Sequence, residues 1–220
     1  MEVLFRKGFL GFFLGILFVL PVSAFAYLPL VVTQDSLHDV EPISDPTVAQ
    51  TFYGRLQGFP HTYEIRSKEP FLLRVEVLIP DREVAKETVN SIIIREVGKQ
   101  GVVTEVTRIL AKDALWESFY EPWGGDRYRR GGTFESTVDA GVYRIELSTP
   151  DNDTQYVLSI GTEDGDVGYF EMVGRIADVK VFFGKSRLMV IQSPYVYIPL
   201  LVIFALGGLW YWYRMRVKAS

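Results

Sequence analysis

Hydrophobic positions follow three patterns along the chain: an apolar run near each end, and between them short stretches in which apolar and polar residues alternate. The later run, residues 193–213, contains no charged residue. A helix rises about 1.5 Å per residue, so roughly twenty residues cross the ~30 Å hydrocarbon core of a bilayer. A single span in lipid must satisfy its backbone hydrogen bonds internally, which only a helix does. The run therefore predicts one C-terminal transmembrane helix.

Aromatic and basic residues flank this predicted span. Tyrosines lie at its start, and tryptophans and tyrosines at its end, which is the belt pattern of a helix that crosses two membrane interfaces. A basic tail, residues 214–220, follows and indicates the cytoplasmic side. The predicted membrane-interface residues are Tyr195, Tyr197, Trp210, Tyr211, Trp212, Tyr213, Arg214, Arg216 and Lys218.

The earlier run is typical of a secretory signal peptide, residues 1–26. Arg6 and Lys7 precede an apolar stretch at 8–20, and Ala24 and Ala26 form an A-x-A cleavage pattern. The alternative is an uncleaved anchor that continues through the apolar residues 27–32 and gives a second membrane pass. In both cases positive charge lies on the cytoplasmic side of the flanking segments, so the middle of the chain is expected outside the cytoplasm, in a cell-membrane protein.

Residues 49–162 consist of about eight short runs with a period of two, separated by Gly, Pro and Asx turns. The longest run is 71–79, and the segment Asp151–Asn152–Asp153 is typical of a hairpin turn. A 3.6-residue period is missing here, which argues against a helical domain. The pattern predicts an all-β fold, an antiparallel jelly-roll-like β-sandwich. Residues 27–48 before it are expected to be an extended segment.

A helical period appears in the connecting segment, residues 163–192. Apolar residues at spacings of three and four predict an amphipathic helix over about 167–183, with Gly184 as the left-handed residue after its end. One interpretation places this juxtamembrane helix in the outer membrane interface, with the basic residues Arg175, Lys180, Lys185 and Arg187 near lipid phosphates. A second packs it beneath the sandwich as a stalk. A third pairs residues 179–183 with 188–191 as a β-hairpin.

Part of the β region resembles a known family. The stretch 134–160, FESTVDAGVYRIELSTPDNDTQYVLSI, is similar to the last strands of bacterial pre-peptidase C-terminal (PPC) domains, with their "AGtY" strand, turn and "Y.L.v" strand. Residues 52–56 and 63–65 resemble that family's opening strands. The resemblance covers about 110 residues with an insertion around 110–131. It implies a jelly-roll-like accessory module for binding or folding, with no catalytic residues to transfer.

The insertion gathers aromatic side chains in a glycine-rich segment, residues 114–132, which we expect to be a loop. Aromatic faces on a loop can stack on a sugar or hold an arginine or a peptide. The alternative is that these rings close the open end of the sandwich. The candidate ligand surface consists of Trp116, Phe119, Tyr120, Trp123, Asp126 and Tyr128.

The amino-acid composition excludes several kinds of functional site. There is no cysteine, so disulfides, thiolate catalysis and cysteine-based metal sites are excluded. Residues 27–213 hold 18 Lys and Arg against 26 Asp and Glu, a balance that argues against a nucleic-acid partner. His38 and His61 lack zinc-helix spacing, residues 163–166 lack the closing ligand of an EF-hand, and no G-x-S-x-G or phosphate loop occurs. We therefore expect no catalytic residue, cofactor or metal.

These observations predict a membrane-anchored extracytoplasmic binding module without catalytic activity. Its expected partners are the bilayer and a protein, peptide or glycan. The alternative is an accessory subunit of a larger membrane complex, in which the span packs on other helices. A membrane-anchored hydrolase is a third class, but the sequence shows no nucleophile or metal set for it.

Overall fold

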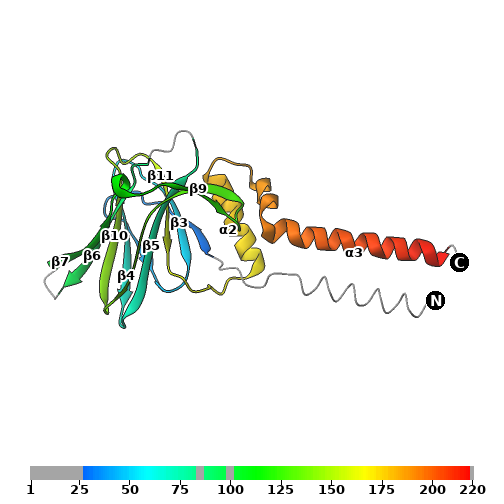
Figure 1. The fold of residues 1–220 in the computed structure, drawn as a ribbon, viewed down its shortest axis with the longest axis horizontal. Coiled ribbons are helices and arrows are strands. Elements are labelled where there is room, and N and C mark those ends of the chain that lie inside the picture. Colours follow the sequence, from blue (N-terminus) through cyan, green and yellow to red (C-terminus); the bar gives the residue numbers. More distant parts are fainter. Residues whose placement is uncertain (1–26, 83–86, 98–101, 219–220) are drawn as a thin grey trace.

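Two stacked β-sheets form a sandwich, and three helical segments follow it toward the C-terminus (Figure 1). The computed structural model describes residues 27–82, 87–97 and 102–218. The predicted signal peptide, residues 1–26, lies outside the described residues. The prediction of an all-β sandwich followed by an apolar helix is confirmed.

Most consecutive strands alternate between the sheets, but the strands of residues 90–97 and 102–109 share one sheet, and those of residues 117–121 and 126–138 share the other. The six-stranded sheet has the order β1 (Leu28–Val31), β3 (Gln50–Arg55), β11 (Gln155–Ile160), β5 (Phe71–Pro80), β9 (Asp126–Val138) and β8 (Glu117–Glu121). The five-stranded sheet has the order β2 (Val40–Ile43), β4 (His61–Ser67), β10 (Gly141–Ser148), β6 (Asn90–Val97) and β7 (Val102–Ile109). Neighbouring strands are antiparallel except β1 with β3 and β2 with β4, which are parallel. A short 3-10 helix, η1 (Ala111–Asp113), precedes β8.

The turn at Asp151–Asn152–Asp153 does not close a hairpin. It joins β10 to β11, and these two strands lie in different sheets. Its Asx chemistry is as expected: Asn152 has a positive φ of 46°, and its side-chain oxygen accepts a hydrogen bond from the Thr149 amide at 2.9 Å. The turn therefore carries the chain from one layer to the other, which local sequence cannot distinguish from a hairpin.

The hydrophobic core lies between the sheets. Alternate residues of β5, including Leu73, Val75 and Ile79, are fully buried there and pack with Tyr63 and Ile145 of the other sheet. This is the burial expected from the period-two pattern, because successive side chains of a strand point to opposite faces. Alternation thus fixes which residues face the partner sheet.

Three polar side chains are linked by hydrogen bonds within the core. The hydroxyls of Tyr63 and Tyr156 lie 2.7 Å apart, and the Tyr156 hydroxyl also lies 2.7 Å from His61 Nδ1. All three side chains are fully buried. Burial lowers the pKa of His61 and raises that of Tyr156, so each group stays neutral near pH 7.

Residues 27–48, expected to be an extended segment outside the sandwich, contribute one edge strand to each sheet. Leu28 pairs with Gln50 and Val40 with Thr62. Both strands are only four residues long and contain a proline, Pro29 in β1 and Pro42 in β2. Proline lacks the amide that a central strand needs but is tolerated at an edge, so these strands left no alternating signal.

The aromatic insertion is a β-hairpin rather than a loop. β8 pairs with the first residues of β9, from Glu117 opposite Arg130 to Glu121 opposite Asp126. Gly125 closes the turn with a φ of +73°, a conformation that suits glycine. Of the glycines that indicated a loop, Gly124 and Gly125 lie in a four-residue turn, and Gly131 and Gly132 lie within β9.

The predicted amphipathic helix is α2 (Tyr169–Phe182), and Gly184 follows it with a φ of +70°. The helix packs on the outer face of the six-stranded sheet and buries Met172, Ile176 and Val179 there. This agrees with the stalk interpretation and not with a helix lying in the membrane interface. The hairpin alternative is wrong, because a 3-10 helix, η2 (Arg187–Gln192), follows.

The final helix, α3 (Pro194–Lys218), extends away from the sandwich (Figure 1). Residues 194–217 form a helix long and apolar enough to cross a membrane, and an 18-residue stretch within them has a mean hydropathy of 1.6 and no buried residue. Near its end the guanidinium of Arg214 lies 5.1 Å from the Trp210 ring, and that of Arg216 lies 4.1 Å from the Trp212 ring. Basic and aromatic side chains are thus paired at the end of the apolar segment.

Candidate functional site

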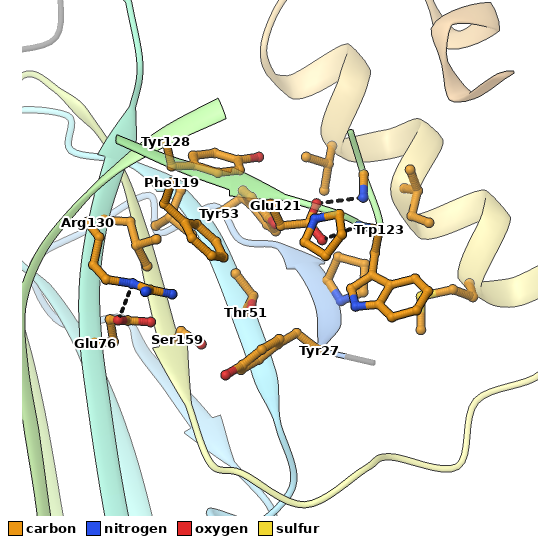
Figure 2. A pocket seen from close by; sticks show the side chains of 18 of the residues that line it. Tyr27, Thr51, Tyr53, Glu76, Phe119, Glu121, Trp123, Tyr128, Arg130 and Ser159 are labelled. Carbon is orange, nitrogen blue, oxygen red and sulfur yellow. Dashed lines mark hydrogen bonds and ion pairs between the residues drawn. The ribbon is translucent and has the colours of Figure 1, made fainter. Parts of the chain in front are cut away.

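A pocket lies between the outer face of the six-stranded sheet, helix α2 and the β8–β9 hairpin (Figure 2). Its volume of about 550 Å³ falls in the range of roughly 300–1,000 Å³ found for small-molecule sites. Most of its wall is apolar, and a few polar groups are set into it. This combination of shape and lining is typical of a ligand site.

The floor of the pocket consists of two neighbouring rows of side chains across strands β3, β11 and β5. In one row Thr51 is paired with Ser159, and Ser159 with Glu76. In the next row the paired residues are Tyr53, Val157 and Leu78. Residues two apart on a strand share a face, so the register places a polar row directly beside an apolar row.

Helix α2 forms the apolar wall opposite this floor. Met172, Ile176 and Val179 line the pocket and are buried. Burying large apolar side chains removes them from water at about 25 cal/mol per Å² of apolar surface, which keeps the helix on the sheet. The outer face of the sheet is therefore a second buried layer in this region rather than a solvated surface.

An ion pair lies at one end of the pocket. Arg130 Nε lies 2.6 Å from Glu76 Oε1, and the Arg130 guanidinium lies 4.0 Å from the centre of the Phe119 ring. The Thr133 hydroxyl also donates to Glu76 at 3.3 Å. Glu76 is buried, so its charge is matched by the guanidinium and the hydroxyl. Figure 2 shows this pair on the opposite side of the pocket from Trp123.

A second carboxyl, Glu121, lies at the end of β8. Its two oxygens accept hydrogen bonds from the backbone amides of Trp123 at 2.7 Å and Gly124 at 2.6 Å. Burial raises the pKa of Glu121 to about 7, although these two hydrogen bonds and Lys180 act in the opposite direction. Glu121 is therefore only partly ionised near neutral pH.

The turn between β8 and β9, residues 121–126, connects the sandwich to the helices. Lys180 is fully buried, and its ammonium donates to the Gly124 carbonyl at 2.6 Å and to Asp126 Oδ2 at 2.8 Å. Lys185 pairs with the other oxygen of Asp126. The prediction that Lys180 lies on a polar face near lipid phosphates is wrong, because Asp126 and Gly124, distant in sequence, supply its partners inside the protein.

The same turn contacts the start of α3. The Ser193 hydroxyl donates to the Trp123 carbonyl, and the Trp123 ring lies 5.0 Å from the Tyr195 ring. The Tyr169 hydroxyl of α2 donates to the Tyr195 carbonyl at 2.7 Å. Trp123 therefore belongs both to the pocket lining and to the junction with the apolar helix.

The six residues of the predicted ligand surface are not gathered on one surface. Phe119, Trp123 and Tyr128 line the pocket. Asp126 is buried with Lys180, and Tyr120 is exposed. Trp116 packs against the core between the sheets, and its indole nitrogen donates to the Ala111 carbonyl at 3.1 Å. That contact matches the alternative in which rings close the end of the sandwich.

Sequence reasoning missed the charged and hydroxyl-bearing residues that line the pocket beside its aromatic rings: Thr51, Arg74, Glu76, Glu121, Arg130, Ser159 and Thr162. One signal was present: the runs VEVLIP in β5 and QYVLSI in β11 are apolar on both faces over part of their length. Such runs are typical of strands covered on both sides. In the described part of the chain, no group of three or more His, Asp or Glu side chains is arranged to hold a metal ion.

Comparison with known proteins adds little. No protein-family model and no curated protein matches the chain. Among solved structures, the PPC domain of a collagenase from Bacillus anthracis matches 58% of this chain and 98% of its own, at 12% identity and a TM-score of 0.34. CorA, a surface-associated copper-binding protein important in copper acquisition by Methylomicrobium album BG8, matches 57% and 98%, at 7% identity and a TM-score of 0.31.

Fold and site together define a β-sandwich domain with a largely apolar pocket, followed by a helix long and apolar enough to span a membrane. The PPC resemblance of residues 134–160 concerns strands β9, β10 and β11. It concerns the sandwich alone, since these three strands belong to its two sheets.

Proposed function

We propose that this protein is a membrane-anchored binding module that holds a small ligand outside the cytoplasm, next to the bilayer, and performs no catalysis. The observation that carries the proposal is the position of the pocket. One of its walls, Trp123, stacks on Tyr195 in the first turn of the apolar helix α3. A ligand in the pocket is then held where the sandwich meets the membrane.

Several features support anchoring with the sandwich outside. The apolar part of α3 is not buried inside the protein, and basic residues follow the aromatic end of this helix. A signal-like segment precedes the first strand in sequence. Together these features support a single pass with the sandwich extracytoplasmic and the C-terminus in the cytoplasm.

The polar groups of the pocket support binding rather than catalysis. Glu76 is engaged by Arg130 and Thr133, and both oxygens of Glu121 are held by backbone amides. No histidine is among the described residues that line the pocket. General acid–base catalysis requires a group free to reach the reacting atom, and these carboxyls are directed toward protein partners.

Fractionation of cells that produce the full chain tests this proposal. The chain should stay in the membrane pellet after an alkaline carbonate wash, and protease added to intact cells or spheroplasts should digest the sandwich but not a C-terminal tag. A matched variant that ends at Gln192 lacks α3 and should be released from membranes. Release of the full chain by carbonate, or protection of the sandwich from external protease, would overturn the proposal.

One observation favours the accessory-subunit alternative. Gly207 and Gly208 lie in the middle of α3 with open space beside them, so another helix can approach the backbone closely there. Exchange of residues 198–213 for an unrelated apolar span, which keeps Tyr195 against Trp123, would separate the two functions. A fixed partner that co-purifies in detergent with the natural chain and is lost on this exchange supports the subunit function, whereas ligand binding in the pocket is unaffected by it.

A further inference from the structure

Two hydroxyls on the floor of the pocket have no hydrogen-bond partner among the described residues. They belong to Thr51 and Ser159, which are 7% and 6% exposed and are paired across β3 and β11. Both side chains project from the sheet into the pocket (Figure 2). Their oxygens are not sealed inside the protein but open toward the pocket, so a bound molecule can reach them. The row therefore offers two donor–acceptor groups to a bound molecule.

The charges beside this row favour an uncharged ligand head. Glu76, the next residue of the row, is neutralised by Arg130 at 2.6 Å. The lining of the pocket contains two glutamates, Glu76 and Glu121, and two arginines, Arg74 and Arg130. An anionic head would face the carboxyls, and a cationic head would face the guanidinium groups. A hydroxyl both donates and accepts, so it can bind a carboxylate, a guanidinium and other hydroxyls without adding charge. Several hydroxyls on one head fit this set of groups.

The rest of the pocket suits an alkyl chain. Val157, Leu78, Met172 and Ile176 form apolar surfaces on the floor and on α2. At about 30 Å³ for a water-sized group, 550 Å³ has room for roughly eighteen such groups. A methylene group is about as large as the water-sized group used in this estimate. That is about the size of a glycerol head with its ester and roughly eleven carbons of one acyl chain, so the rest of an oleoyl chain lies beyond the pocket and a second chain does not fit.

The far end of the pocket indicates the source of the ligand. Trp123 lies at the side opposite Glu76 and Arg130 and stacks on Tyr195 of α3 (Figure 2). A molecule with its head at the Thr51–Ser159 row therefore directs its chain toward the start of the span. A bilayer supplies single-chain amphiphiles at this position.

We propose that the pocket binds a single-chain amphiphile with an uncharged, hydroxyl-bearing head, of the monoacylglycerol class, with its head on Thr51, Ser159 and the Glu76–Arg130 pair. This inference rests on the proposed binding function and specifies its ligand. Apolar contact supplies most of the affinity, and the polar row selects the head.

Photocrosslinking of the full chain in lipid nanodiscs tests the proposal without a competing detergent. The probe is a monoacylglycerol with a diazirine in its acyl chain, and the labelled residues are identified by mass spectrometry. Labels are expected on pocket residues of β11 and α2. Unlabelled 1-monooleoylglycerol should displace the probe at concentrations at least tenfold lower than oleate, oleylamine or dioleoylglycerol.

Two variants assign the head group to the polar row. Thr51→Val combined with Ser159→Ala preserves the shape of the floor and removes both hydroxyls, so it should weaken 1-monooleoylglycerol roughly tenfold or more and reduce its advantage over oleate. Val157→Trp should fill the pocket and abolish labelling. Thr104→Val, at an exposed position of β7 in the other sheet, is the matched control and should leave labelling unchanged.

The proposal is overturned if labels fall outside the pocket, if oleate or oleylamine competes as well as 1-monooleoylglycerol, or if the double variant keeps the head preference of the natural chain. The outcomes also separate the two levels of inference. A chain that is anchored with its sandwich outside but shows no pocket labelling refutes the ligand class alone. A chain released by carbonate refutes the binding module at the membrane, whatever the crosslinks show.

Discussion

Replacing Lys180 by methionine tests the connection between the sandwich and its helices. Lys180 is fully buried, and its ammonium has two partners in the β8–β9 turn, the Gly124 carbonyl and Asp126 Oδ2. Methionine keeps most of the apolar volume of the lysine side chain but removes the charge and the donors. The substitution therefore leaves the buried Asp126 carboxylate with one cation, Lys185, instead of two.

The magnitude follows from the burial of both partners. Removing one member of a buried ion pair costs about 3–5 kcal/mol, since the other charge is left without its partner. Because Lys185 still pairs with Asp126, we expect the lower value, about 3 kcal/mol. In a folded unit of 150–250 residues each 1 kcal/mol lowers Tm by about 2–4 °C, so the variant should melt roughly 6–12 °C below the natural chain.

Scanning calorimetry and near-ultraviolet circular dichroism of the full chain in detergent measure this difference. Lys185→Met is the matched control: the Lys185 side chain is about one-third exposed, so its loss should cost no more than about 1 kcal/mol. Adding Asp126→Leu to Lys180→Met should recover part of the loss, because the unpaired charge is removed. A Lys180→Met variant within about 1 kcal/mol of the natural chain would refute the described ion pair.

Three further changes test other groups. Between pH 4.5 and 7 the natural chain should lose up to about 3 kcal/mol of unfolding free energy relative to Glu121→Gln, because the raised pKa makes folded Glu121 keep a proton that the unfolded chain releases. Urea titrations of both proteins at several fixed pH values measure this difference, and a difference that does not change with pH contradicts it. Burial lowers the pKa of His61 in the folded chain, so the stability that neutral His61 contributes is present above about pH 6.5 and is lost as the pH falls. In the same titrations the natural chain should therefore lose more unfolding free energy than His61→Phe between pH 7.5 and 5. Gly161→Ala should lower the unfolding free energy by about 1–3 kcal/mol in thermal unfolding, because φ is +79° and the new methyl group meets the Val48 carbonyl. Gly168→Ala is the control, since its methyl group would enter open space, and equal losses in the two variants would contradict this prediction.

Much of the fold follows from local pattern. The alternation in β5 and β10 identifies residues that face the other sheet, and the 3.6-residue period of α2 identifies the side chains that it buries. These elements were predictable because burial on one face imposes a period on the sequence. The strands that carry little pattern, β1 and β2, were missed because an edge strand of four residues with a proline imposes almost none.

The pocket depends on contacts that local pattern does not contain. Thr51, Ser159 and Glu76 become neighbours only through the strand order β3–β11–β5. Lys180 looked like a solvated residue because its partners, Gly124 and Asp126, lie more than fifty residues earlier. A charged residue on a helix shows its burial only when the surface packed against it is known.

The position of Trp123 has a mechanical consequence. Its ring forms one wall of the pocket and also rests against Tyr195 at the base of α3, and its carbonyl holds Ser193. A thinner bilayer makes an apolar helix tilt to match the hydrocarbon thickness. If α3 spans a bilayer as proposed, such a tilt moves its base against the indole, so the space available to a ligand in the cavity would vary with the thickness of the surrounding lipid.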